Sequence, residues 1–172
     1  SNEAGSAIAM LAGKYIKKSV LELGGSDPLI IFPDADIRVA AAGAFTGRFL
    51  NCGQSCIAAK RIIVHNSVYE EFLNSFIQNI KEARVGDPTE KDTFIGPMVN
   101  RKAAEDIDYQ VKRSVAMGAR MILEGGLSEY GPAFFNPAVL CDIPSESPME
   151  SEEVFGPVAP IFRFGKTEDA TE

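Results

Sequence analysis

The chain has 172 residues, of which 45% are hydrophobic and 24% charged, and its formal net charge is −7. This composition excludes an intrinsically disordered chain, and the length is sufficient to bury a real core. Because polyanion-binding proteins are usually basic, and because the apolar runs are too short to cross a bilayer and no signal-peptide pattern opens the chain, we expect neither a nucleic-acid nor a membrane partner.

The cysteine and histidine content is low. Three cysteines, an odd number, do not make a disulfide framework, and with His65 as the single histidine they lack the spacing of a zinc site. We therefore expect free thiols, no metal site and a reducing, cytoplasmic compartment.

Helical and strand-like patterns alternate along the first part of the chain. Apolar residues recur at helical spacing over residues 1–18, and again in a helix that Asp34 or Asp36 can cap and that fades near Gly53. Apolar and β-branched runs predict strands at 20–23, 28–32 and 61–65.

The alternation continues to the end of the chain. Ser67 and Glu70 have the spacing of a capping box for a helix that Gly86 stops, and Asn100 and Gly118 have the positions of the two caps of the next helix. The remaining predicted elements are strands at 120–123, 137–141 and 158–164 and a helix start at 167–172. This order predicts an α/β fold of three layers, αβα, with a mainly parallel sheet.

Three places carry residues with possible chemistry. Cys56 lies on a glycine-containing loop between a helix and a buried strand, where a thiol is either exposed or a small core residue. Glu22 interrupts an apolar run before two glycines, as a solvent-facing residue or as a partly desolvated base. Glu153 and Phe155 precede a Gly-Pro turn, on a solvated loop or on one that meets a ligand. A thiol hydrolase would need His65 as its base, which we consider the weaker hypothesis.

These three places resemble the hallmark motifs of the aldehyde dehydrogenase superfamily, in the order of that family. The 34-residue separation of Glu22 from Cys56 also matches the family, and the resemblance covers essentially the whole chain. Residues 23–28 and 53–61 look most like the NAD(P)-dependent succinate-semialdehyde dehydrogenase branch. The motifs are Leu21-Glu22-Leu23-Gly24-Gly25, Phe49 with Gly53-Gln54-Ser55-Cys56, and Glu153-Val154-Phe155-Gly156-Pro157.

The resemblance implies a role for each of these residues. Cys56 would attack the aldehyde carbonyl, hydride would leave to NAD or NADP, and Glu22 would activate the water that hydrolyses the resulting thioester. Glu153 would bind the nicotinamide ribose hydroxyls, Phe155 would pack beside the nicotinamide ring, and the Leu23 carbonyl would face the carboxamide.

Four further residues receive weaker assignments. Ser1 would belong to the turn at the helix that meets the cofactor pyrophosphate. Arg48 is the candidate cation for a substrate carboxylate, with a solvated helix arginine as the alternative, and Phe49 would lie beside the substrate. Cys52 is a candidate redox partner of Cys56, with a small apolar core residue as the alternative.

We therefore expect an oxidoreductase that converts an aldehyde, succinate semialdehyde first, to its acid. The alternatives are another aliphatic aldehyde or semialdehyde dehydrogenase and a non-enzymatic fold segment or interaction module. Residues 1–18 would be a helix of the cofactor-binding domain and 19–172 a C-terminally truncated catalytic domain. The resemblance also implies a homo-oligomer, and that these residues alone are inactive.

Overall fold

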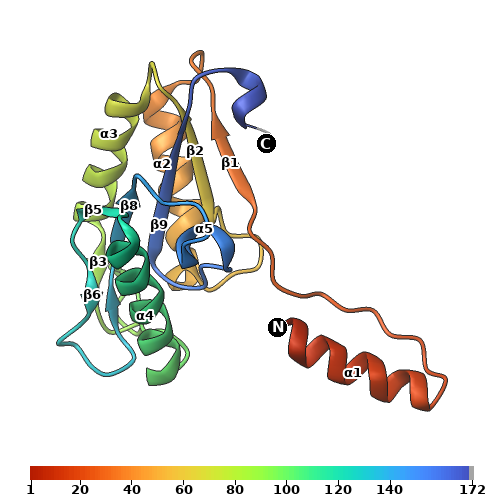
Figure 1. Ribbon diagram of the computed structural model, residues 1–172. Helices are drawn as coiled ribbons and strands as arrows, with labels where there is room; N and C mark the ends of the chain where they lie inside the picture. The colour runs from red at the N-terminus through yellow and green to blue at the C-terminus, as the bar shows by residue number, and fades with distance from the viewer. Residues whose placement is uncertain (171–172) are drawn as a thin grey trace.

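The computed structural model describes residues 1–170 and contains a five-stranded sheet in the order β1-β2-β9-β8-β5 (Figure 1). Three of its four neighbouring pairs are parallel, and only β5 and β8 run antiparallel. The predicted mainly parallel sheet is therefore confirmed. Its strands are β1 (Pro28–Ile31), β2 (Arg61–His65), β5 (Arg120–Leu123), β8 (Ala138–Cys141) and β9 (Val158–Phe164).

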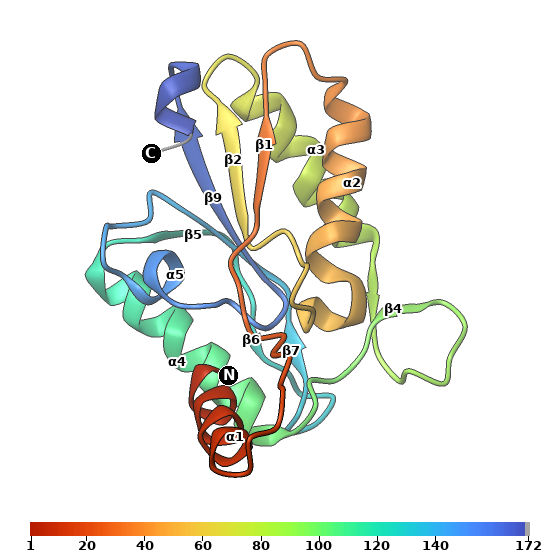
Figure 2. The same cartoon turned by 90° about the vertical axis from the view of Figure 1, so that its right-hand side faces the viewer.

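Helices lie on both sides of this sheet. One pair, α2 and α3, packs side by side on one face, while α4 and α5 lie on the opposite side (Figures 1 and 2). The layered α/β arrangement expected from the sequence is present. The bounds are α2 (Ile37–Phe49), α3 (Tyr69–Glu82), α4 (Arg101–Met117) and α5 (Pro148–Ser151). Among residues 1–170, no helix is long and apolar enough to cross a membrane.

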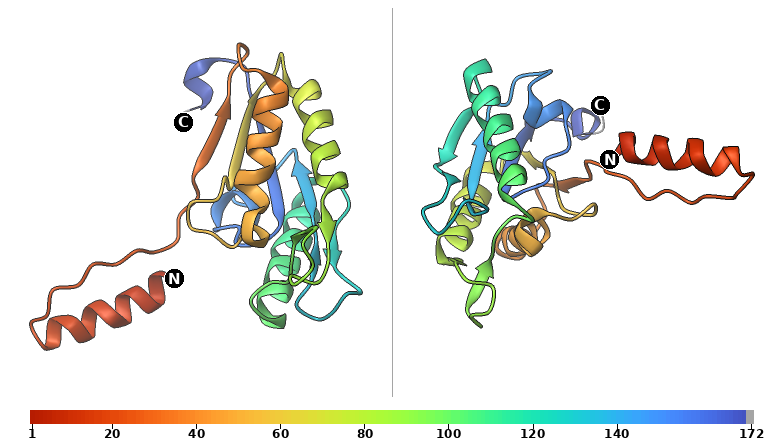
Figure 3. Two further views of the ribbon diagram at one scale, coloured as in Figure 1. Left: turned by 180° about the vertical axis from the view of Figure 1, so that it is seen from behind. Right: turned by 90° about the horizontal axis from the view of Figure 1, so that it is seen from below.

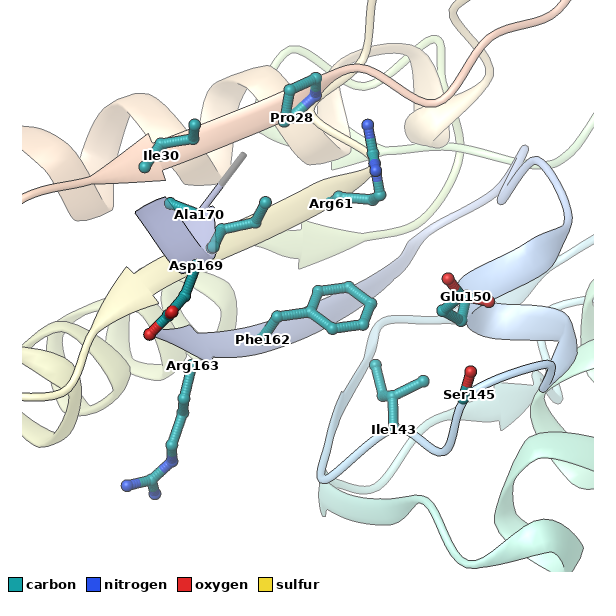
Figure 4. A pocket seen from close by; sticks show the side chains of 11 residues that line it. Pro28, Ile30, Arg61, Ile143, Ser145, Glu150, Phe162, Arg163, Asp169 and Ala170 are labelled. Carbon is teal, nitrogen blue, oxygen red and sulfur yellow. The ribbon is translucent and has the colours of Figure 1, made fainter. Parts of the chain in front are cut away.

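The two faces of β1, β2 and β9 are covered unequally. In β2, Ile62 and Val64 are buried, whereas Ile63 is only half-buried. On this less covered face, Ile63 joins Ile30 and Phe162 in an open pocket of about 550 Å³ (Figure 4). None of the residues singled out as catalytic or cofactor-binding lines this pocket, so it is separate from the candidate site.

Several short elements escaped the sequence analysis. Each spans only two to four residues, too few for a periodic pattern to develop. One short parallel pair, β3–β4, follows α3, and an antiparallel pair, β6–β7, follows β5. They are β3 (Arg84–Val85), β4 (Thr93–Ile95), β6 (Gly126–Leu127), β7 (Phe135–Asn136) and the 3₁₀ turn η1 (Leu50–Gly53). The helix start predicted at 167–172 is a 3₁₀ turn, η2 (Thr167–Ala170), and residues 171–172 lie outside the described residues.

The N-terminal part differs most from expectation. Helix α1 (Asn2–Lys14) ends four residues early, and Ile16 takes a positive φ of 53°. The strand predicted at 20–23 is wrong: the segment is extended but pairs with no described strand, and Val20 is 83% exposed. An apolar run forms a strand only when a neighbouring strand takes up its backbone hydrogen bonds.

Helix α1 stands apart from the sheet at the end of this extended segment (Figures 1 and 3). Of the residues in α1, only Gly5 is buried. The Leu23 side chain lies against it so closely that a Cβ at Gly5 would come within 2.8 Å of Leu23 Cδ2. A glycine therefore allows α1 to pack on the segment that carries Glu22.

The helix caps can be compared one by one. Asp36, not Asp34, caps α2, because its Oδ1 accepts hydrogen bonds of 3.1 Å from the backbone N–H groups of Arg38 and Val39. Asn100 caps α4 through a 2.9 Å bond from Ala103 N, and Gly118 ends that helix at φ 119°. Both α4 predictions are confirmed.

The predicted capping box of α3 is wrong. The helix begins at Tyr69, and the Ser67 hydroxyl lies 2.8 Å from His65 Nδ1 instead of capping the helix. Glu70 turns outward and accepts a 2.9 Å bond from Arg163 of β9. The helix also ends at Glu82, before the predicted stop, because the chain leaves it to form β3.

Candidate active site

The loop that carries Cys56 begins with a left-handed turn. Directly after α2, Asn51, Cys52 and Gly53 take positive φ values of 53°, 57° and 70°. A non-glycine residue in this region costs of order 1–3 kcal/mol, so other contacts must hold the turn. The turn brings the chain out to Cys56, which is exposed, and the segment then returns into β2.

Gln54 supplies part of the contacts that hold this turn. Its Nε2 donates to Asn51 O at 3.3 Å, and Asn51 Nδ2 donates back to Gln54 O at 2.9 Å. Its Oε1 accepts a 2.8 Å bond from the backbone N–H of Val99, just before α4. The glutamine of the cysteine motif therefore fastens the loop to itself and to the start of α4.

Gly53 is the point where the cysteine loop meets the loop of Glu153. A Cβ at Gly53 would overlap the carbonyl oxygen of Gly156 and lie 2.6 Å from Arg48 Nη2. Only glycine combines this close approach with a φ of 70°. The motif glycine is thus explained by backbone contact between two loops far apart in sequence.

Arg48 fills the space behind these loops, and the assignment to a substrate carboxylate is corrected here. Its side chain is fully buried, and Nη2 donates to Gly53 O at 3.0 Å, Val154 O at 3.0 Å and Gly156 O at 2.6 Å. Nη1 donates to Ala59 O at 3.4 Å. Burial lowers the pKa of Arg48 to about 10, which leaves it protonated at neutral pH. The guanidinium holds backbone carbonyls together and presents no charge to a substrate.

A second buried cation, Lys60, was missed by the sequence analysis. Its Nζ donates to the carbonyl oxygen of Cys56 at 2.7 Å and forms an ion pair of 2.8 Å with Glu153 Oε1. It also lies 5.9 Å from the centroid of the Phe155 ring. The Lys60 side chain is fully buried, whereas that of Glu153 is 30% exposed. One ammonium therefore joins the nucleophile motif to the Glu153 motif.

The Glu22 motif, residues 21–25, also contacts Glu153. The backbone N–H of Gly25 donates to Glu153 Oε1 at 3.3 Å, and a Cβ at Gly24 would overlap the carboxylate. From α4, Gln110 Nε2 donates to Glu152 Oε2 at 2.8 Å and to Glu153 O at 3.3 Å. The two glycines after Glu22 thus allow close approach of the Glu153 side chain.

Glu22 itself is exposed. It makes no hydrogen bond or ion pair with any residue of the described part of the chain. In this structure Glu22 therefore faces solvent, as the first of the two alternatives expected. The role of Glu22 as the base stays a prediction from the motif.

The N-terminus of α1 lies near Glu153. Ser1 and Glu153 line one cleft of about 310 Å³, together with Gly24, Gly25 and Ser26. The Ser1 hydroxyl accepts a 3.3 Å bond from Ala4 N and so caps α1. A helix N-terminus favours anionic phosphate, and a carboxylate accepts hydrogen bonds from ribose hydroxyls, so these residues fit a dinucleotide. Phe155 is 43% exposed and leaves ring surface free beside Lys60.

Phe49 is not a substrate contact, and that expectation is corrected. Its side chain is fully buried, with its ring centroid 5.7 Å from that of Phe45 and 6.1 Å from that of Phe76. The motif phenylalanine anchors the end of α2 in the core between the helices, and thereby fixes where the cysteine loop begins.

The other cysteines differ sharply from Cys56. Cys52 is buried with its Sγ 3.8 Å from Met98 Sδ, and burial raises its pKa to about 12. A thiol protonated at neutral pH does not supply the thiolate that a redox partner of Cys56 needs, so the apolar alternative describes Cys52. Cys141 is also buried, and burial raises its pKa. Within residues 1–170, no group of three or more His, Cys, Asp or Glu side chains could hold a metal ion.

The family model described as aldehyde dehydrogenase family matches residues 1–172. An NADP⁺ succinate-semialdehyde dehydrogenase of Mycobacterium tuberculosis is 43% identical over the whole chain, which covers 38% of that relative. A second, from Mycobacterium avium, is 44% identical, with 36% of its length covered. The chain therefore spans less than two fifths of these relatives.

Solved structures of aldehyde dehydrogenases also match this chain. The succinate-semialdehyde dehydrogenase of Burkholderia pseudomallei superposes with a TM-score of 0.93 at 34% identity, over 98% of this chain and 35% of that one. The lactaldehyde dehydrogenase of Escherichia coli has a TM-score of 0.93 at 36% identity, over 99% and 36%.

Proposed function

The chain belongs to the aldehyde dehydrogenase family, and from this premise we propose that it carries the nucleophile and part of the cofactor site of an NADP-linked oxidation of succinate semialdehyde to succinate. The observation that supports this most is the convergence on Lys60 of the exposed Cys56 and the carboxylate of Glu153. The mycobacterial relatives, which are NADP⁺ succinate-semialdehyde dehydrogenases, support the substrate and the cofactor.

The chemistry divides between Cys56 and Glu22. The Cys56 thiolate attacks the aldehyde carbonyl carbon, and the Cys56 backbone N–H donates to the resulting alkoxide. When bound, the cofactor would supply the acceptor for the hydride that leaves the former aldehyde carbon, so that the alkoxide becomes the carbonyl of a thioester on Cys56. Glu22 then takes a proton from water, the hydroxide attacks the Cys56 thioester, and the acid leaves as the thiolate is restored. Solvent access to Cys56 and Glu22 in this structure supports both steps.

The chain's own residues would hold the cofactor as follows. Glu153 would accept hydrogen bonds from the nicotinamide ribose, and Phe155 would pack beside the nicotinamide ring. The Leu23 carbonyl would face the carboxamide, and the end of α1 at Ser1 would receive the phosphates. In this proposal residues 1–18 belong to the cofactor-binding domain and the rest to the catalytic domain, which is supported by the separation of α1 from the sheet (Figure 3).

Two wider proposals concern the whole protein. The three free cysteines support a reducing, cytoplasmic compartment. The exposure of Met10, Ile16 and Val20, at 75%, 94% and 83%, supports further apolar contacts in the full-length protein or in a homo-oligomer.

Steady-state kinetics of the full-length protein test the function. With NADP⁺, we expect kcat/KM for succinate semialdehyde to exceed that for hexanal at least tenfold, an estimate of about 1.4 kcal/mol in specificity. Cys56→Ala should abolish NADPH formation. Dehydrogenase activity that survives Cys56→Ala would remove the nucleophile assignment.

A second candidate function is the oxidation of an aliphatic aldehyde without a distal carboxylate. The burial of Arg48 favours it, because that side chain was the one cation near Cys56 available to a carboxylate in the sequence analysis. The likeness to lactaldehyde dehydrogenase also fits this alternative. Equal kcat/KM values for succinate semialdehyde and hexanal would favour it over the first proposal.

A further inference from the structure

We propose that Lys60 is a positioning residue that sets the distance between the Cys56 loop and the Glu153 carboxylate and so prepares Glu153 for the cofactor. The inference rests on the proposed function and adds a residue to those that the three motifs supply. It comes from the contacts of one ammonium group.

The first observation is where Lys60 Nζ lies. It is 2.7 Å from the carbonyl oxygen of Cys56 and 2.8 Å from Glu153 Oε1, with the Phe155 ring beside it. These two acceptors belong to the two loops whose backbone carbonyls also accept hydrogen bonds from Arg48. Lys60 therefore contacts a functional side chain, whereas these Arg48 bonds go to backbone carbonyls.

The second observation is how the Glu153 carboxylate is used. Lys60 and the N–H of Gly25 both contact Oε1. Oε2 accepts no hydrogen bond from any described residue; one side of it lies against Gly24, where a Cβ would overlap it, and the side chain is 30% exposed. One oxygen is thus anchored while the other can accept hydroxyl donors, which is the arrangement needed to receive a ribose.

The third point concerns energetics. A buried ion pair adds little net stability, because desolvation offsets the attraction, and apolar groups of similar shape often replace it without loss. A fully buried lysine is therefore poorly explained by stability. Its position between the nucleophile loop and the cofactor carboxylate accounts for a cation at this place.

The test compares four variants of the full-length protein in cofactor binding and adds a fifth, Lys60→Arg, for turnover. Lys60→Met keeps the length of the side chain and removes its charge, Glu153→Gln removes the carboxylate, and the double variant removes both. Lys112→Met is the control, because the Lys112 side chain is 73% exposed and its ion pair of 2.6 Å with Asp108 lies within α4.

Binding of NADPH or NADH, whichever wild type binds more tightly, is measured by the fluorescence of the reduced cofactor. We expect Lys60→Met to weaken binding about tenfold, the loss of roughly one good hydrogen bond. Glu153→Gln should weaken binding similarly. The double variant should match Glu153→Gln, since Lys60 acts on binding through Glu153, whereas Lys112→Met should match wild type.

Turnover at saturating cofactor tests the contact between Lys60 and the Cys56 carbonyl oxygen. Lys60→Met should keep kcat about tenfold or more below wild type, because excess cofactor does not restore the anchor on the Cys56 carbonyl. For the same reason the double variant should turn over more slowly than Glu153→Gln. Lys60→Arg, which keeps a cation, should recover part of the loss.

Each outcome decides the matter. Wild-type binding and kcat in Lys60→Met, or effects of Lys60→Met and Glu153→Gln on binding that multiply, would overturn the inference while leaving the proposed function intact. A wild-type protein that neither binds the reduced cofactor nor oxidises an aldehyde would overturn both. If Lys60→Met does not fold, the double variant, which contains no unpaired charge, is compared with Glu153→Gln, and weaker cofactor binding than Glu153→Gln would refute the inference.

Discussion

Two buried cations connect the loop of Cys56 with the loop of Glu153. Arg48 donates to the backbone carbonyls of both loops, and Lys60 donates to the Cys56 carbonyl and to the Glu153 carboxylate. Their acceptors come from segments far apart in the chain, so the two cations determine how the motifs meet. Removing Arg48 leaves buried backbone carbonyls without this donor, and each such group is costly.

Arg48 provides the first prediction. Arg48→Met removes donors from four backbone carbonyls, and we expect the free energy of unfolding to fall by about 3 kcal/mol. Urea unfolding measures this, with Arg38→Met, an exposed arginine in α2, as the control that should change little. A normal stability together with a raised KM for succinate semialdehyde would instead support the substrate role that the structure argues against.

The thiols provide the second prediction. Cys56 is exposed, whereas burial raises the pKa of Cys52 to about 12 and also raises that of Cys141. A raised thiol pKa means less thiolate, and the thiolate is the nucleophile. At pH 8, iodoacetamide should therefore label Cys56 well before the other two, as shown by mass mapping of peptides. Labelling of Cys52 or Cys141 at the rate of Cys56 would contradict this.

The element that shapes the site is the left-handed turn between α2 and Cys56. It requires Gly53, where a Cβ would overlap Gly156 O. Gly53→Ala should lower the free energy of unfolding by roughly 2 kcal/mol or more and remove activity. Gly43→Ala is the matched control, because Gly43 lies in α2 with nothing near its Cβ, and should be neutral or stabilising by about 0.5–1 kcal/mol. A folded, active Gly53→Ala enzyme would mean that the turn adopts another conformation.

Among the secondary-structure elements, the sequence predicted the strands whose apolar runs pair with a neighbouring strand in the sheet. The β-branched run at 61–65 and the run at 158–164 became strands with the predicted bounds. The run at 20–23 has the same local character but no strand beside it, and pairing is not encoded locally. Ser67 fitted a capping box by spacing, but its hydroxyl is taken by His65, which no local pattern indicates.

The candidate site as a whole was predicted through its motifs rather than through geometry. Cys56 and Glu153 are recognisable from the residues around them. Lys60 precedes a strand next to Arg61 and looks like one half of a solvated basic pair, so its burial could not be inferred. Arg48 was misjudged for the same reason, because an arginine on a helix is usually exposed and only tertiary packing buries it.

A further prediction concerns these 172 residues taken alone. They cover 36–38% of the curated relatives, and the cofactor contacts that we propose for them are limited to Ser1, Leu23, Glu153 and Phe155. We expect the isolated chain to fold around its sheet yet to form no NADPH from succinate semialdehyde, because a loosely held hydride acceptor loses the benefit of positioning. Absorbance of NADPH measures this, and detectable turnover would contradict it.

The most direct test of the account is to trap the acyl group on Cys56. In full-length Glu22→Gln, thioester hydrolysis should be slow while the preceding steps proceed, so one burst of NADPH should accompany acylation. Mass spectrometry of peptides after mixing with NADP⁺ and succinate semialdehyde should then find the succinyl group on Cys56, removable by hydroxylamine. A burst that leaves Cys56 unmodified, or an acyl group on another cysteine, would contradict the assignment of Cys56 as the nucleophile.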